Sequence, residues 1–151
     1  FLNSCNKSQP PNNRMARQSE RVGRSGEYLV ASVLSTLSDT VTVMPHGSKA
    51  DIIFEVGQTL YKCQVKTQKQ IEKARKNWRF DLRCGSHSKN RFYNKGDIDV
   101  YALVALNCQK VMFFFPDGRK QVSVEDKDIQ AIDSLKNVEN LFKELQCQQT
   151  P

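Results

Sequence analysis

The chain has 151 residues, enough for one domain whose core needs no disulfide or metal for stability. Its formal net charge of +7 and pI near 9.3 favour a polyanion as partner. Five cysteines without a CxxC pair argue against a disulfide framework or structural zinc, so we expect free thiols in a reducing, intracellular compartment such as the cytoplasm. Two histidines do not support a His-rich metal centre, and no apolar run is long enough to make a membrane a partner.

The sequence changes character near residue 17. Residues 1–16 are polar and lack apolar periodicity, so we expect a flexible segment followed by one domain over residues 17–147. Ser19 or a neighbour can cap a helix, because apolar residues recur at helical spacing after it. Gly23 and Gly26 weaken this helix locally, but they also allow another backbone to approach it closely.

The region after this helix alternates between strand-like runs and loops. Runs rich in β-branched and aromatic residues, bounded by Gly, Asn or Asp, favour strands. The acidic, mixed stretch from about residue 125 to 146 favours one or two helices. These elements predict an α/β (α+β) domain with a central mixed sheet. The expected strands are 40–44, 51–56, 59–66, 77–83, 99–106 and 111–115, with a basic loop at 84–95.

Two of these runs predict a hairpin that gathers three polar side chains. If Gly57-Gln58 is a two-residue loop, the register places Asp51 opposite Gln64, with Cβ atoms roughly 5 Å apart. Gln64 and Lys66 lie two positions apart in one strand, so they share a face. A loop one residue longer or shorter would separate the three. The sequence therefore predicts a carboxylate, an amide and an ammonium group around one point on a half-solvated surface.

Basic residues are concentrated around this hairpin. The segment from residue 66 to 95 is strongly basic, and its acids are Glu72 and Asp81. A second cluster of arginines, at positions 14, 17, 21 and 24, lies before and within the first helix. A phosphate backbone is the natural partner of such surfaces. The candidate DNA-binding residues are Arg24, Ser48, Lys49, Lys69, Arg75, Lys76, Arg79, Arg83, Lys89, Arg91 and Tyr93.

The three polar residues together suit phosphodiester hydrolysis. That reaction needs a nucleophilic water, charge neutralisation at the phosphate and stabilisation of the leaving oxyanion. A hard cation held by oxygen ligands, with a lysine to orient or deprotonate the water, supplies these. Taken singly, Asp51 could open a strand, Lys66 could be a solvated charge and Gln64 says little. Ser48 and Lys49 could contact the scissile phosphate, or could simply form a polar turn.

The pattern Asp-x12-Gln-x-Lys resembles the core of the PD-(D/E)XK nuclease superfamily, in which Gln can replace the middle acid. The stretches GEYLVASVLSTL, PHGSKADIIFEV, LYKCQVKT and GDIDVYALVAL look most like the compact branch of intron-encoded homing endonucleases. The resemblance covers about residues 20–115. It implies a restriction-endonuclease-like core, with a four-stranded mixed sheet flanked by helices. It also implies Mg²⁺ as cofactor, with Mn²⁺ as a possible substitute.

The resemblance also implies roles for single residues. Asp51, Gln64, Lys66 and Glu27 would form the catalytic set. The metal ligands would be Asp51, Gln64, Glu27 and the backbone carbonyl of Val65, although Glu27 could also be a solvated helix charge. Two positions depart from the family pattern: Ala50 stands in place of the Pro, which is not a ligand, and Gln64 replaces the usual acid. The second departure removes a negative charge and should weaken metal binding.

The leading interpretation is a Mg²⁺-dependent DNA endonuclease, most specifically a site-specific homing endonuclease acting on double-stranded DNA. One small domain cannot cut both strands at once, so we expect a homo-oligomer, a dimer or a dimer of dimers. The apolar strands and the C-terminal helix are candidate contact surfaces. A Holliday-junction resolvase is the alternative within the enzymes, and a noncatalytic DNA-binding protein is the alternative outside them.

Overall fold

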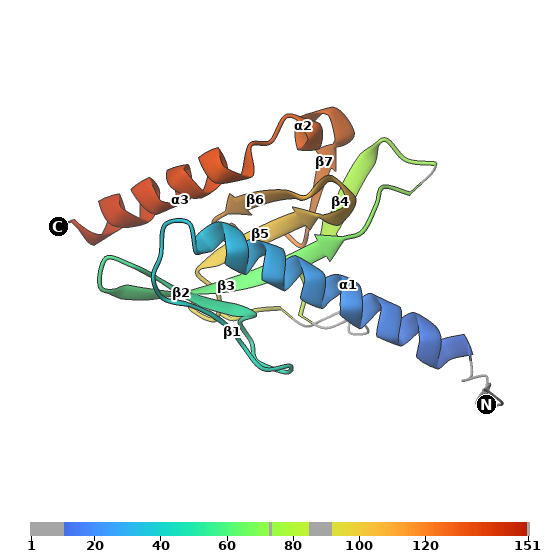
Figure 1. The fold of residues 1–151 in the computed structure, drawn as a ribbon, viewed down its shortest axis with the longest axis horizontal. Helices are drawn as coiled ribbons and strands as arrows, with labels where there is room; N and C mark the ends of the chain where they lie inside the picture. Colours follow the sequence, from blue (N-terminus) through green and yellow to red (C-terminus); the bar gives the residue numbers. More distant parts are fainter. Residues whose placement is uncertain (1–10, 73, 85–91, 151) are drawn as a thin grey trace, which may run out of the picture.

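Five strands form the central sheet of the computed structural model, which describes residues 11–72, 74–84 and 92–150 (Figure 1). Helices cover one side of this sheet, and a two-stranded sheet lies on the other. The elements are α1 (Pro11–Leu34), β1 (Val41–Val43), β2 (Ile52–Val56), β3 (Thr59–Gln68), β4 (Asn77–Asp81), β5 (Val100–Ala105), the 3-10 turn η1 (Leu106–Cys108), β6 (Lys110–Phe114), β7 (Gln121–Glu125), α2 (Asp126–Gln130) and α3 (Ser134–Gln149).

The central sheet has the order β1-β2-β3-β5-β6. Strands β3 and β5 are parallel, and the other neighbouring pairs are antiparallel. All six residues of β5 are buried, as expected for a strand covered on both faces. The predicted mixed α/β architecture is therefore confirmed. The sheet has five strands where the resemblance implied four, and β1 and β6 form its two edges.

Helices α1 and α3 pack on one face of the sheet. In α1, Val30, Val33 and Leu34 recur at helical spacing and meet apolar residues of β2, β3 and β5. The apolar residues of α3 follow the same rule and are buried in this cluster. That face of α3 was a candidate subunit contact, and this expectation was wrong because the protein's own sheet already covers it. The residues of α3 concerned are Val138, Leu141, Phe142 and Leu145.

The other face of the sheet is covered by β4, β7 and α2, which the sequence interpretation had not joined. Strand β7 was not predicted, although its sequence QVSVE alternates, and it pairs with β4 in antiparallel register. Trp78 of β4 is 3 % exposed, and its Nε1 donates a hydrogen bond to Asp126 of α2 at 2.8 Å. The side chain of Trp78 therefore joins β4 to α2 within this second layer.

Helix α1 begins earlier than expected. It starts at Pro11, so residues 11–16, which we had placed in a flexible segment, are helical. Proline suits the first turn of a helix, because the backbone N–H that it lacks would have no partner there. Residues 1–10 lie outside the described residues. The N-terminal part of α1 extends well beyond the sheet (Figure 1).

Two expectations from composition concern the cysteines and the membrane. The four cysteines in the described part of the chain are free thiols, as predicted, and Cys5 lies outside it. Among the described residues, no helix has both the length and the apolar character needed to cross a bilayer.

Candidate active site

The β2–β3 hairpin has the predicted register. Val56 pairs with Thr59 and Ile52 with Cys63, so the loop consists of Gly57 and Gln58. Gly57 has a φ of +65°, a conformation that favours glycine. The regular pairing ends at Ile52, because the backbone N–H of Asp51 donates to the carbonyl of Cys63 at 2.9 Å, the residue that already pairs with Ile52. Asp51 and Ile52 therefore both face Cys63, as in a β-bulge, and it is the side chain of Asp51 that reaches Gln64.

The carboxylate of Asp51 binds both residues that follow Cys63. Its Oδ2 accepts a hydrogen bond from Nε2 of Gln64 at 2.6 Å and another from the backbone N–H of Val65 at 2.7 Å. Both bonds end on Oδ2, so neither uses Oδ1. The backbone N–H and C=O of a strand residue point to the same side, and the Val65 carbonyl is therefore directed toward Asp51. The Asp51 carboxylate and the Val65 carbonyl, both predicted as metal ligands, thus face the same region.

Gln64 is more buried than predicted. We expected a half-solvated surface, but Gln64 is only 8 % exposed. Its neighbour across the ladder, Tyr101 of β5, belongs to the apolar cluster under β4 and β7, and that layer covers this face. Within the described part of the chain, Oε1 of Gln64 is buried without a hydrogen-bond partner. Such an oxygen has a desolvation cost that a cation or a donor would offset.

Glu27 reaches the site because α1 packs very closely on β3. A Cβ placed on Gly26 would lie 1.8 Å from Oγ1 of Thr67 in β3, so only glycine permits this approach. Burial raises the pKa of Glu27, and the negative charge of Asp51 raises it further. Arg24 and His46 oppose this shift. The charges of the Glu27 and Asp51 carboxylates therefore repel each other.

Burial also raises the pKa of Asp51, and it is the largest influence on that pKa. The hydrogen bond from Val65 and the charges of Lys66 and His46 lower the pKa. Two adjacent carboxylates with raised pKa values suit a site that a cation would complete. Among the described residues, however, no three His, Cys, Asp or Glu side chains form a group that could hold a metal ion. A cation here would depend on the Gln64 amide and the Val65 carbonyl as well as on the carboxylates. The unpartnered Oε1 of Gln64 fits that requirement.

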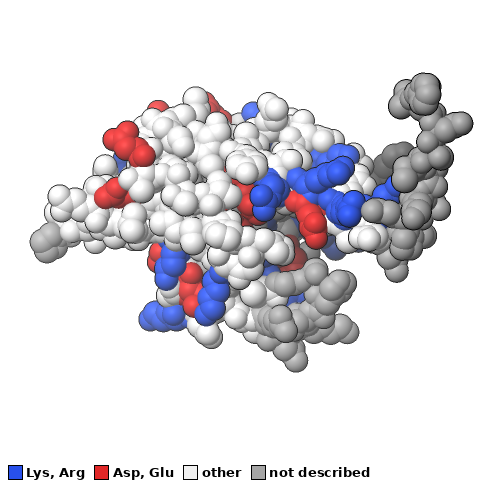
Figure 2. Space-filling model, turned by 60° about the horizontal axis from the view of Figure 1, so that its bottom comes forward, with Lys and Arg blue, Asp and Glu red and all other residues white. Residues whose placement is uncertain are grey.

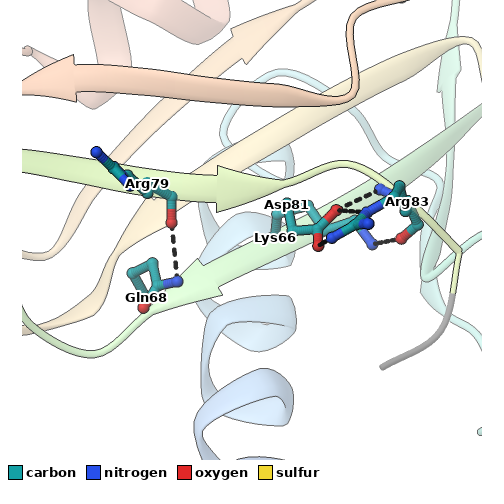
Figure 3. A network of polar contacts seen from close by, with 5 residues as sticks. All are labelled: Lys66, Gln68, Arg79, Asp81 and Arg83. Atoms are coloured by element: carbon teal, nitrogen blue, oxygen red, sulfur yellow. Dashed lines mark hydrogen bonds and ion pairs between the residues drawn. The ribbon is translucent and has the colours of Figure 1, made fainter. Parts of the chain in front are cut away.

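Lys66 lies on the same face of β3 as Gln64, but its ammonium group contacts the segment that follows β4 (Figure 3). Nζ donates to the backbone carbonyl of Arg83, just after β4, at 2.9 Å. It also lies 5.6 Å from the ring centroid of Tyr93. Burial lowers the pKa of Lys66, and the negative charge of Asp51 is the largest opposing effect. The sequence did not reveal the Arg83 carbonyl, because any residue carries that group.

The end of β4 is fixed by further contacts with β3 (Figure 3). Nε2 of Gln68 donates to the carbonyl of Arg79 at 2.8 Å. The guanidinium of Arg83 forms an ion pair with Asp81, with Nε at 2.8 Å from Oδ1. This pairing lowers the pKa of Asp81 to about 2. The network holds the carbonyl that binds Lys66 in place.

The candidate DNA-binding residues differ in their surroundings. Three are engaged in ion pairs: Lys49 with Asp97 at 3.0 Å, Arg75 with Glu72 at 2.9 Å, and Arg83 with Asp81. Tyr93 is half-buried and packs edge-on against Tyr101. Lys89 and Arg91 lie outside the described residues. The exposed positions without an ion pair to any described residue are Arg24, Ser48, Lys69, Lys76 and Arg79.

A groove of about 460 Å³ opens between α1 and the loop after β1. It is lined by Glu20, Arg21, Gly23, Arg24, Glu27 and His46. His46 is exposed in this loop. It lines the groove together with Glu27, which places it beside the site. The sequence indicates none of this, because the loop and the helix meet only in the fold.

Comparison with known proteins finds a solved structure with the same fold. No protein-family model and no curated protein matches the chain. Among solved structures, a bacterial homing endonuclease, I-Ssp6803I, superposes with a TM-score of 0.65. The two chains are 18 % identical, and the match covers 87 % of this chain and 97 % of the endonuclease. At this level of identity the comparison establishes the shared fold.

Proposed function

We propose that this chain is a Mg²⁺-dependent DNA endonuclease, and more specifically a site-specific homing endonuclease. The observation that carries the proposal is the contact of Asp51 with Gln64 and Val65, together with the unpartnered Oε1 of Gln64. Its position on a fold shared with a homing endonuclease supports the same conclusion. The positive charge of the chain suits a polyanionic substrate.

The residues would have two roles in hydrolysis, metal binding and activation of the attacking water. Asp51, Gln64, Glu27 and the Val65 carbonyl would hold Mg²⁺, or Mn²⁺ in its place. When bound, such an ion neutralises charge on the phosphate and on the leaving oxygen. Lys66 would orient the attacking water and accept its proton as the water oxygen attacks phosphorus and the P–O bond breaks. The lowered pKa of Lys66 favours the neutral amine that this role needs.

Double-strand cleavage needs two such sites, so we propose a homo-oligomer with a roughly palindromic target. A noncatalytic DNA-binding protein is the competing function with an observation in its favour. Gln64 stands where an acid would supply a second negative charge, and the described residues contain no group of three acidic, His or Cys ligands. Such a protein would bind DNA and leave it intact.

One assay separates these functions. The purified chain is incubated with a library of linear duplexes and with a synthetic four-way junction, with and without Mg²⁺. A homing endonuclease cuts one duplex sequence and needs the metal, whereas a resolvase nicks the junction symmetrically regardless of sequence. Binding without any cleavage in Mg²⁺ or Mn²⁺ would overturn the proposed activity.

A further inference from the structure

The N-terminal half of α1 carries a line of arginines on one face. Arg14, Arg17, Arg21 and Arg24 follow each other at alternating steps of three and four residues. At about 100° per residue they fall within an arc of about 80°, and they extend over about 15 Å of helix. The exposed Tyr28 continues the same spacing. We name these four arginines the arginine stripe.

The stripe is open to solvent. Residues 13–21 are all exposed, and the first partly buried residue of α1 beyond them is Val22. None of the four arginines forms an ion pair with a described residue. Figure 2 shows basic side chains gathered at the end of the molecule where α1 extends beyond the sheet. The first turn of α1 contains no acidic residue, and the positive end of the helix dipole adds to the positive potential of the arginines.

The stripe leads directly to the candidate active site. Arg21 and Arg24 line the groove of about 460 Å³ that also contains His46 and Glu27. The acids of the groove, Glu20 and Glu27, lie on the flank of the helix beside the stripe, about 120° and about 140° around the helix from Arg14. A chain of phosphates lying along the stripe would therefore enter the groove beside Glu27.

From this geometry we infer that the arginine stripe binds the phosphate backbone of the DNA duplex and directs one strand into the groove beside Glu27 and His46. This inference deepens the proposed function and rests on it. A duplex carries one negative charge per about 1.7 Å of axis, so four guanidinium groups over about 15 Å can each meet a phosphate. Guanidinium groups suit this contact because they bind phosphate oxygens in a bidentate manner.

Two other occupants fit the stripe less well. A second copy of the same helix would place arginine opposite arginine at the positions where a coiled coil needs apolar residues. An anionic membrane surface needs an apolar face on the other side of the helix. Residues 13–21 contain only Met15 and Ala16 as apolar residues. The polar character of this half of α1 on every side instead suits a helix that a polyanion stabilises.

The test measures DNA binding in the absence of cleavage. The variant R14Q/R17Q/R21Q and the unchanged full chain are titrated with a fluorescent duplex in EDTA, at salt concentrations from 50 to 200 mM. If each arginine meets one phosphate, the salt-dependence slope of the variant falls by about 2.7. The loss of affinity across this fourfold range of salt then becomes roughly 40-fold smaller than in the unchanged chain. Circular dichroism checks that the helix remains, because Gln has a helix propensity near that of Arg.

The matched control is K127Q/K136Q/K143Q. These three lysines are exposed on α2 and α3, and each triple variant lowers the formal net charge from +7 to +4. We expect the control to keep nearly the full slope. Equal slopes for the two variants, or a changed oligomeric state with unchanged binding, would overturn the inference. If the stripe variant loses DNA binding and the unchanged chain does not cleave DNA in Mg²⁺, the proposed activity is rejected. The inference that the stripe binds DNA is then kept.

Discussion

The two halves of the candidate active site are built in different ways. Asp51 and Gln64 meet at the end of a local hairpin whose two-residue loop sets the register, and their side chains form a hydrogen bond there. Glu27 and Lys66 depend on distant segments: a helix that contacts β3 through Gly26, and the carbonyl of Arg83 at the end of β4. The local half fixes which groups are present. The long-range half sets their burial, and with it their pKa values.

The largest effect should come from the local half. Replacing Asp51 with Asn keeps a hydrogen-bond acceptor for Val65 but removes the charge that would hold a cation. We expect cleavage to fall about 1000-fold, since loss of several kcal/mol of charge stabilisation corresponds to that factor. DNA binding should change little. Cleavage rates and binding in EDTA are the measurements, and retained cleavage would remove Asp51 from the proposed mechanism.

The stability of the same variant tests the burial of Asp51. The pKa of this carboxyl is raised in the folded state, so the ionised form is penalised above that pKa. The penalty disappears as the pH falls through the folded pKa. We therefore expect the Asn variant to be at least as stable as the unchanged chain at neutral pH, by thermal unfolding without metal. A large loss of stability would show that the ionised carboxylate is needed for the fold.

Lys66 tests the half built by distant contacts. Lys66→Met keeps the length of the side chain but removes the amine, and we expect about a 100-fold loss of cleavage, typical of a general base. In the unchanged chain, cleavage should rise with pH and level off below 10.5, because burial lowers the pKa of Lys66 from that value. Rate–pH profiles check this. A profile that falls as pH rises from neutrality would assign Lys66 a cationic role.

The same lysine makes a prediction for stability. Between the lowered folded pKa and the unfolded value near 10.5, the unfolded chain binds more protons, so the free energy of unfolding should rise with pH. This rise should be absent from Lys66→Met. Denaturant unfolding of both proteins across that range measures the difference. Identical slopes in the two proteins would contradict the burial of the ammonium group.

Two glycines of α1 offer a matched pair of smaller effects. Gly26→Ala places a methyl group 1.8 Å from Oγ1 of Thr67, so we expect about 2 kcal/mol less stability and weaker cleavage, because Glu27 moves with the helix. For Gly23→Ala, no atom of another described segment lies within 4 Å of the new Cβ, so this variant should gain up to about 1 kcal/mol from helix propensity. Opposite signs in chemical denaturation would confirm the close contact of α1 with β3. Two stabilised variants would contradict it.

Gln64→Glu should give the smallest change, and it concerns the metal. A second carboxylate next to Asp51 cannot easily ionise with it, so we expect a loss of about 1 kcal/mol in stability without metal. Added Mg²⁺ should restore stability more in this variant than in the unchanged chain. Thermal unfolding with and without Mg²⁺ measures both effects. Equal responses to Mg²⁺ would argue against Gln64 as a ligand.

Part of this site could be predicted from the sequence because it depends on local rules. Gly57 predicted a two-residue loop, and the alternation of side chains predicted which residues share a face of each strand. The contact between Asp51 and Gln64 was predicted from these two features together. The burial of Gln64 could not be predicted, since it depends on β7 and the layer that β7 forms with β4. Tyr93 is partly buried against the same layer, and the burial that lowers the pKa of Lys66 likewise depends on the tertiary structure. The arginine stripe was visible as spacing, but its exposure was not.

The order of residues alone determined the hairpin register, the positions of the apolar faces and the excess of positive charge, because each of these follows from neighbours a few positions apart. The tertiary structure decided which basic residues are neutralised by acids, which amide oxygen is buried without a partner and how closely α1 approaches β3. Those features depend on contacts between segments far apart in the chain, and local periodicity carries no information about such contacts.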